Sequence, residues 1–251
     1  MSFYRGIYKV FAPLVKLVYR ITAEGVENIP AGGAILAANH TAFSDPIVIS
    51  AAARRQVRYM AKKELFHFPL GPIIRSLGAY PVDRGGADVG SIRRTIEMIE
   101  EGELIGIFPQ GHRRGGEDIR NTEIKPGVGM FAWHTKAAVV PVFIGNKRMK
   151  TGLFRKNRVV FGKPLLFEDL LFERGGKTEY LTASRLVFSR ICALAYPDDV
   201  PEALPGSGPE PGSTLSDPVK QYASDSGESP KDPDAGLPPN GPPNGREKED
   251  A

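Results

Sequence analysis

Short apolar runs alternate with segments of helical periodicity along residues 33–196. The runs are four to seven residues long and are bounded by turn-forming residues, as buried strands are. Apolar residues recur at helical spacing over about 87–101, and helices are also predicted at 46–53, 128–136 and 179–196. The predicted strands are 33–38, 57–61, 79–82, 104–108, 138–144 and 158–161.

This order of strands and helices predicts an α/β domain whose mainly parallel sheet is covered by helices on both faces. Open sheets of this kind bind ligands where strands end and helices begin. Three predicted strands are followed directly by polar groups, namely His40, Arg84 and the loop Gln110–Arg113. These three strand ends are therefore candidates to converge on one crevice.

Residues 1–22 form an amphipathic segment. At 100° per residue its basic side chains fall within an arc of roughly 60°, and apolar side chains occupy the opposite side. Pro13 is expected to kink or divide this helix. We favour a helix lying in the plane of an anionic bilayer, which does not exclude packing on the domain. The alternative is an ordinary surface helix that covers the core. The basic residues are Arg5, Lys9, Lys16 and Arg20.

Residues 197–251 differ in composition from the rest of the chain. They hold 12 of the 22 prolines and carry 12 acidic but only 4 basic residues, a net charge of −8. Such a stretch cannot bury enough apolar surface to offset its ordering entropy, so we expect a disordered acidic tail. The domain is then expected to span residues 23–196, and residues 1–196 together carry a net charge of +12.

A body with this charge favours a polyanionic partner, either nucleic acid or an anionic membrane surface. Nucleic acid is not expected, because no groove-reading motif or aromatic platform accompanies the charge. The single cysteine, Cys192, excludes an internal disulfide framework. No signal peptide is visible, and no apolar run approaches the roughly 20 residues of a spanning helix. We therefore expect a protein at the cytoplasmic face of the membrane, peripheral or monotopic.

An imidazole and a carboxylate lie five residues apart in the turn between the first predicted strand and its helix. In such a tight turn the carboxylate of Asp45 can reach back to the ring of His40. A carboxylate bound to one imidazole nitrogen fixes the tautomer and leaves the other nitrogen free to accept a proton. Asp45 followed by Pro46 is also typical of a helix N-cap, a role compatible with orienting His40.

Four short blocks resemble those of the glycerolipid acyltransferase family, typified by the 1-acylglycerol-3-phosphate O-acyltransferases. His40 through Asp45 resembles the first block, His-x4-Asp, and Tyr80–Arg84 resembles the second, whose arginine helps to hold the acceptor's phosphate. Phe108–Arg113 is similar to the third block, normally Phe-Pro-Glu-Gly-Thr-Arg, and Val140–Val142 matches the fourth. The blocks occur in the family's order, within a resemblance that covers residues 26–163.

The resemblance implies transfer of a fatty acyl group from an acyl thioester to the free hydroxyl of a lysophospholipid, 1-acyl-glycerol 3-phosphate, to give phosphatidate. The donor is acyl-CoA or acyl carrier protein, and no metal ion or cofactor is expected. His40 is then the general base, oriented by Asp45. No serine or cysteine lies in a nucleophile elbow, so an acyl-enzyme is not expected. The residues expected at the phosphate are Arg84, Gln110, Gly111 and Arg113.

Two positions depart from the family pattern. Gln110 replaces the usual glutamate, and His112 replaces the usual threonine. Glutamine keeps the length and an acceptor oxygen but loses the negative charge. If the glutamate orients a partner by hydrogen bonding, Gln110 can do the same; if its charge is essential, activity is low or acceptor preference altered. The alternatives are an acyltransferase for another lysolipid or glycerol 3-phosphate, and a catalytically silent lipid-binding protein.

A second basic cluster lies beside the apolar stretch 65–70. The resemblance implies that it belongs to a membrane-facing surface, and a solvated helix face is the alternative. The cluster consists of Arg54, Arg55, Arg58, Lys62 and Lys63.

Overall fold

The computed structural model describes residues 12–67, 70–82 and 89–197. Its strands are β1 (Ile21–Glu24), β2 (Ala34–Ala38), β3 (Val57–Lys62), β4 (Ala79–Val82), β5 (Leu104–Ile107), β6 (Ala138–Gly145) and β7 (Asn157–Phe161). Its α-helices are α2 (Asp45–Ala53), α3 (Leu70–Ser76), α4 (Val89–Glu100), α5 (Gly127–Thr135) and α6 (Lys177–Ala195). Short 3₁₀ turns are η1 (Val26–Asn28), η2 (Lys63–Phe66), η3 (Ile119–Asn121) and η4 (Phe167–Leu170).

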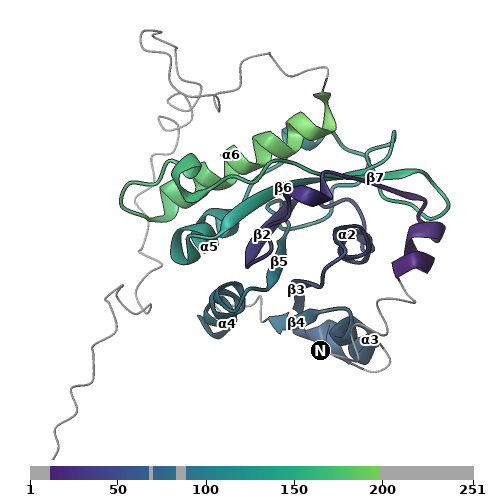
Figure 1. The fold of residues 1–251 in the computed structure, drawn as a ribbon, viewed down its shortest axis with the longest axis horizontal. Helices are drawn as coiled ribbons and strands as arrows, with labels where there is room; N and C mark the ends of the chain where they lie inside the picture. The colour runs from purple at the N-terminus through teal and green to yellow at the C-terminus, as the bar shows by residue number, and fades with distance from the viewer. Residues whose placement is uncertain (1–11, 68–69, 83–88, 198–251) are drawn as a thin grey trace, which may run out of the picture.

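The strands form one sheet in the order β1-β7-β6-β2-β5-β3-β4 (Figure 1). The five strands from β6 to β4 are mutually parallel, so their carboxyl ends lie at one edge. Strand β7 runs antiparallel to β6 and parallel to β1. The prediction of a mainly parallel sheet is confirmed, and the neighbours β6, β2 and β5 bring three connecting loops together.

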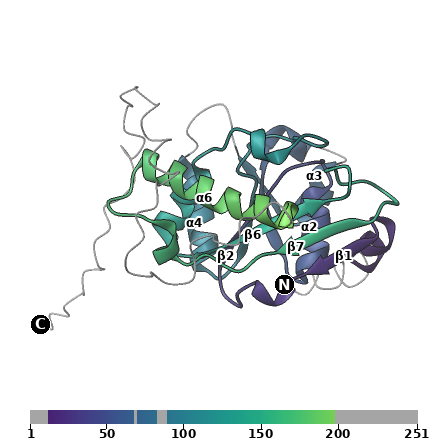
Figure 2. The same cartoon turned by 90° about the horizontal axis from the view of Figure 1, so that it is seen from above.

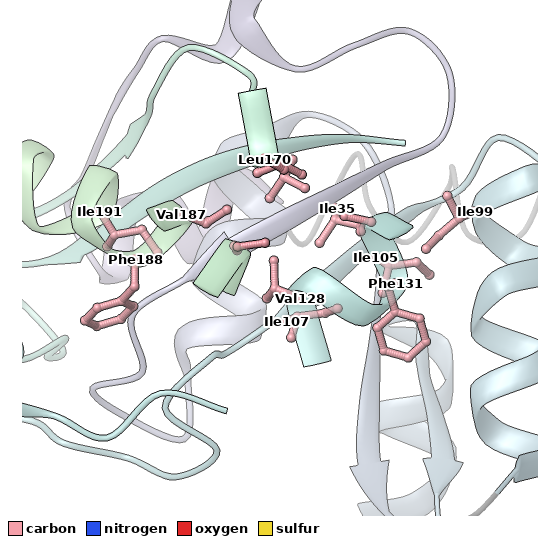
Figure 3. Packing of buried hydrophobic residues seen from close by; sticks show 14 of the residues in the cluster. Ile35, Ile99, Ile105, Ile107, Val128, Phe131, Leu170, Val187, Phe188 and Ile191 are labelled. Carbon is pink, nitrogen blue, oxygen red and sulfur yellow. The ribbon is translucent and has the colours of Figure 1, made fainter. Parts of the chain in front are cut away.

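Helices cover both faces of this sheet. Every residue of β2 is buried, and alternate side chains enter different cores. Ile35 packs with residues of α4, α5 and α6, whereas Leu36 packs with residues of α2. Figure 1 shows α5 and α6 on one side of the sheet and α2 on the other. In Figure 3, Ile35, Ile105 and Ile107 meet Val128 of α5 and Val187 of α6 on one face. Because α2 packs on the other face, the prediction of helices on both faces is also confirmed.

The predicted strands are all present, and each observed bound differs from the predicted one by at most one residue. Where the structure describes the end of a predicted helix, the observed bound differs from the predicted one by at most two residues. One strand, β1, was not predicted. Its residues pair in parallel with the edge strand β7, from Ile21 with Asn157 to Glu24 with Val160. A helix through residue 22 is therefore wrong beyond Val18, where a turn at Tyr19 and Arg20 leads into β1.

The helical residues 12–18 pack only one side on the domain. Ala12 and Val15 are buried against Ala51 of α2, whereas Leu14 is 54% exposed and Leu17 is 73% exposed. Lys16, expected on the polar face, is partly buried, and burial together with the charge of Arg54 lowers the pKa of its ammonium group. This segment therefore covers the core and also presents apolar side chains outward.

Residues 1–11, which include Arg5 and Lys9, lie outside the described residues, as does the predicted tail from residue 198. Among the helices that are described, none combines the length and apolarity needed to cross a bilayer.

Candidate active site

The turn after β2 is attached to the neighbouring strand by Asn39, whose side chain is buried. Its Nδ2 donates to the carbonyl oxygen of Ile144 at 2.8 Å, and its Oδ1 accepts from the N–H of Ile144 at 2.8 Å. This pair of bonds satisfies a buried amide and sets the direction in which the chain leaves β2.

The carboxylate of Asp45 organises the turn that enters α2. Its Oδ2 accepts from the N–H groups of Thr41 at 2.5 Å and Ala42 at 2.8 Å, and Oδ1 accepts from the hydroxyl of Thr41 at 3.1 Å. The N-cap prediction for Asp45 is wrong, because Ser44 occupies that position and the carboxylate is turned back into the preceding loop. Asp45 is fully buried, so these donors replace its hydration.

The imidazole of His40 is held on two sides. Nδ1 lies 2.9 Å from Oδ2 of Asp45, and the ring is stacked on Phe108 with centroids 4.0 Å apart and planes at 16°. Because a carboxylate only accepts, Nδ1 carries the hydrogen and Nε2 is the basic nitrogen. Nε2 makes no hydrogen bond to any residue in the described ranges, and the side chain is 17% exposed. The ring therefore offers one oriented basic nitrogen.

Gln110 joins the His40 turn to the loop after β5. Its Oε1 accepts from the N–H of His40 at 2.7 Å, and its Nε2 donates to Oγ1 of Thr122 at 3.1 Å. The Thr122 hydroxyl in turn donates to the carbonyl of Ile119 at 2.8 Å. Both amide atoms of Gln110 are bonded to protein groups, and at 1% exposure the side chain is not accessible to a phosphate in this structure. It holds the backbone of the histidine instead.

Arg113 lies beside the same turn. Its guanidinium carbon is 6.0 Å from the centroid of the Phe43 ring, and it makes no ion pair with a residue that the structure describes. Gly111 has φ 71°, a conformation that favours glycine, and its N–H donates to the carbonyl of Phe108 at 3.0 Å. The N–H of Gly111 is thus used within the loop.

The connection between β6 and β7, residues 146–156, also contacts the turn that carries His40. The N–H of Thr151 donates to Oγ1 of Thr41 at 3.0 Å, and the two hydroxyl oxygens are 2.8 Å apart. Since Thr41 gives its hydroxyl hydrogen to Asp45, the Thr151 hydroxyl is the donor in this pair. A Cβ at Gly115 would lie 2.3 Å from the carbonyl of Thr41, so the loop after β5 also touches the turn.

The structure brings five of the six predicted site residues to one sheet edge, and the sixth, Arg84, lies outside the described residues. Thr41 and Thr151 were missed, because their bond joins positions 110 residues apart and leaves no local pattern. No group of three or more His, Cys, Asp or Glu side chains suited to a metal ion occurs in the part of the chain that the structure describes. The five that meet are His40, Asp45, Gln110, Gly111 and Arg113.

Known proteins resemble this chain in sequence. The family model described as Acyltransferase matches residues 20–145, which include the His40 turn and the Gln110 loop. The 1-acyl-sn-glycerol-3-phosphate acyltransferase of Bacillus subtilis is 34% identical over 169 residues, or 63% of this chain and 82% of that protein. A protein of the same name from Streptococcus pneumoniae is 30% identical over 141 residues, or 54% of this chain and 51% of that protein.

A solved structure shares the fold. The crystal structure of the 1-acyl-sn-glycerophosphate acyltransferase PlsC from Thermotoga maritima matches with a TM-score of 0.56 and 22% identity, over 74% of this chain and 80% of that chain. The family model matches about half of the chain, and the matched region includes His40 and Asp45. The chain therefore belongs to the acyltransferase family.

Proposed function

We propose that this acyltransferase moves a fatty acyl group from an acyl thioester to the free hydroxyl of 1-acyl-glycerol 3-phosphate, giving phosphatidate. The relatives from Bacillus subtilis and Streptococcus pneumoniae are named for this activity. The observation that carries the proposal is the oriented imidazole of His40, with Nδ1 2.9 Å from the carboxylate of Asp45 and Nε2 unoccupied among the described residues.

In the proposed reaction, Nε2 of His40 removes the proton of the acceptor hydroxyl as its oxygen attacks the thioester carbonyl carbon. The buried carboxylate of Asp45 stabilises the imidazolium that forms. The tetrahedral intermediate then collapses as the carbon–sulfur bond breaks, and the imidazolium returns its proton to the leaving thiolate. The products are an ester and a free thiol, and His40 is neutral again.

Two groups in this scheme position the base. Phe108 stacks on the ring, and Gln110 binds the backbone N–H of His40. Holding the base against its substrate in one geometry lowers the entropic part of the barrier. We therefore assign Gln110 to positioning rather than to the phosphate, where the family resemblance had placed it.

The acceptor's phosphate is proposed to bind at Arg113. Its guanidinium has no ion pair within the described residues and lies beside the His40 turn, so it is available for paired hydrogen bonds to phosphate oxygens. Arg84 is proposed as the second phosphate ligand on the basis of its block in the sequence. Gly111 lets the backbone approach the anion closely, although its own N–H is occupied.

The donor is proposed to be acyl-CoA or acyl carrier protein, and the scheme requires no metal ion and no resident cofactor. The acceptor is a membrane lipid, so we place the enzyme at the cytoplasmic face of an anionic membrane, with peripheral or monotopic attachment. The exposed Leu14 and Leu17 of the first described helix support attachment to a bilayer.

An activity matrix of acyl-CoA and acyl carrier protein donors against several lysolipids and glycerol 3-phosphate tests the proposal. We expect 1-acyl-glycerol 3-phosphate to be the preferred acceptor, and His40→Ala to lower kcat by about a hundredfold or more. His67→Ala is the matched control, because His67 is an exposed histidine outside the turn.

Equal rates for wild type and His40→Ala would remove the base assignment. Preference for another acceptor would replace the proposed substrate. A wild type that binds liposomes but transfers no acyl group would identify a silent lipid-binding protein.

A further inference from the structure

The β6–β7 connection, residues 146–156, exposes two large apolar side chains. Leu153 is 54% exposed and Phe154 is 72% exposed. Phe154 is also held at φ 57°, in the left-handed region that favours glycine or asparagine over an aromatic residue. Neither core packing nor backbone preference accounts for phenylalanine at this position. Leu171 is likewise exposed and held at φ 57°, so these two features alone do not identify a contact outside the domain, and the charge around Phe154 is needed as well.

The same connection carries an uncompensated positive charge. No acidic residue occurs between Asn146 and Lys156. Five basic side chains in it are exposed, and none forms an ion pair with a residue that the structure describes, whereas Arg158 just beyond pairs with Glu24 at 3.2 Å. The five are Lys147, Arg148, Lys150, Arg155 and Lys156. Exposed apolar side chains flanked in the chain by cations match the chemistry of an anionic bilayer, since the apolar groups enter the acyl boundary and the cations meet the headgroups.

This connection adjoins the first described helix. The N–H of Phe154 donates to the carbonyl of Val18 at 2.8 Å, and the N–H of Asn157 donates to the carbonyl of Arg20 at 3.3 Å. Figures 1 and 2 both show the β6–β7 connection beside the purple helical segment. The exposed Leu14 and Leu17 therefore belong to a segment bonded to the one that exposes Leu153 and Phe154.

The connection also touches the active site. Thr151, two residues before Leu153, is bonded to Thr41 of the His40 turn. A membrane that contacts Leu153 and Phe154 would lie next to the base that accepts the proton from a lipid hydroxyl. A lysophospholipid would then reach His40 from the bilayer by a short path.

The basic cluster first expected to face the membrane is divided in the structure. Arg55 donates to the carbonyl of Gly102 at 3.1 Å, and Arg58 pairs with Glu103 at 3.0 Å, near the start of β5. Both guanidinium groups therefore bind at the amino ends of the parallel strands, at the sheet edge opposite their carboxyl ends. The cluster is therefore not one continuous membrane-facing surface.

We propose that the β6–β7 connection, together with the outward side of residues 12–18, is the surface by which the protein docks on an anionic lipid bilayer. The purpose of docking, delivery of the lysolipid to His40, rests on the proposed function, but docking itself is measured without acyl transfer. An acidic protein such as acyl carrier protein would also be attracted by the charge. The exposed Leu153 and Phe154 and their continuity with Leu14 and Leu17 favour a bilayer.

Co-sedimentation of the full chain with vesicles tests this surface, with phosphatidylglycerol mixed into phosphatidylcholine and with phosphatidylcholine alone. Phe154→Ser should lower vesicle affinity by about tenfold or more, because it removes an apolar side chain from the boundary. Arg155→Gln with Lys156→Gln should lower affinity about fivefold for each charge, only on anionic vesicles, and weaken the salt dependence.

Leu171→Ser is the matched control, since Leu171 is 62% exposed and also has φ 57°. It follows η4 in a segment that pairs through Leu165 with Val139 at the start of β6, whereas the connection follows the end of β6. The vesicle affinity of Leu171→Ser should equal that of the wild type. All variants replace exposed side chains, and equal melting temperatures would show that they fold alike.

Vesicle binding like the wild type by both Phe154→Ser and the double charge variant would overturn the proposal. Unchanged vesicle binding with lost binding of acyl carrier protein would assign the surface to a protein partner and would equally overturn it. Reduced vesicle binding by these variants would support the docking surface even if the wild type transferred no acyl group, in which case the proposed function alone would fail.

Discussion

Replacement of Gln110 tests whether this residue positions His40 or binds the phosphate of the acceptor. Its amide is 1% exposed, accepts from the His40 N–H at 2.7 Å and donates to Thr122 at 3.1 Å. Gln110→Leu keeps a similar volume but removes both bonds. The buried N–H of His40 then has no acceptor, and we expect the backbone of the base to shift.

The magnitude follows from the bonds that are lost. A buried donor left without a partner costs about 1–3 kcal/mol, and the bond to Thr122 adds about 1 kcal/mol. The free energy of unfolding should therefore fall by about 2–4 kcal/mol, which lowers the melting temperature by about 5–15 °C in a domain of this size. A misplacement of the imidazole should lower kcat by about ten- to a hundredfold.

The assay measures melting temperature together with kcat and the acceptor KM. Because Gln110 contacts protein groups at both ends, kcat should fall while the acceptor KM changes little. Thr122→Val is the matched control: it removes the acceptor for Nε2 but leaves the bond to His40. Its kcat should stay within about threefold of the wild type, and its stability loss should be about 1–3 kcal/mol, because Nε2 of Gln110 is left buried without an acceptor.

Gln110→Glu restores the residue usual in the family and keeps the acceptor for the His40 N–H. A carboxylate at this buried position loses hydration, so the melting temperature should fall, but kcat should remain near the wild-type value. If Gln110→Leu raised the acceptor KM and left kcat unchanged, Gln110 would be a phosphate ligand and the positioning argument would be refuted.

Three further predictions concern groups away from Gln110. Thr151→Val removes the hydroxyl that donates to Thr41, so unfolding free energy should fall by about 1 kcal/mol and kcat several-fold; unchanged kcat would show that the bond does not order the turn. Burial, with the negative charge of Asp118, raises the pKa of the Cys192 thiol to about 11, so a disulfide reagent at pH 8 should label it slowly in the folded protein and quickly in urea. Hydrogen bonds from Arg120 lower the pKa of Asp118 to about 2, from 3.8. The unfolded chain then binds more protons, so this stability is present above about pH 4 and is lost as pH falls toward about 2. Because the Asp118 side chain is 34% exposed and its partner Arg120 is 49% exposed, solvent screens the pair, and we expect a loss below about 1 kcal/mol in thermal melts. The loss should be absent in Asp118→Asn, and identical pH curves would contradict this.

The sequence by itself determined the elements whose apolar residues follow a regular pattern in neighbouring positions. Strand β2 is five consecutive buried residues, and α4 repeats its apolar positions every turn, so each element carries its own signal in neighbouring positions. The pairing of His40 with Asp45 was predicted for the same reason, since both residues lie in one turn and their bond spans five positions. Local spacing is sufficient for such contacts.

Tertiary structure alone decided the contacts between distant segments. Strand β1 forms because its backbone pairs with that of β7, although its first two residues, Ile21 and Thr22, ended an amphipathic pattern that favoured helix. Gln110 reaches the backbone of His40 across 70 positions, and Thr151 reaches Thr41 across 110. Hydrogen bonds of this kind depend on which loops the parallel strands place at one edge. Single polar residues carry no periodicity that would reveal their partners, so only the folded sheet determines what they hold.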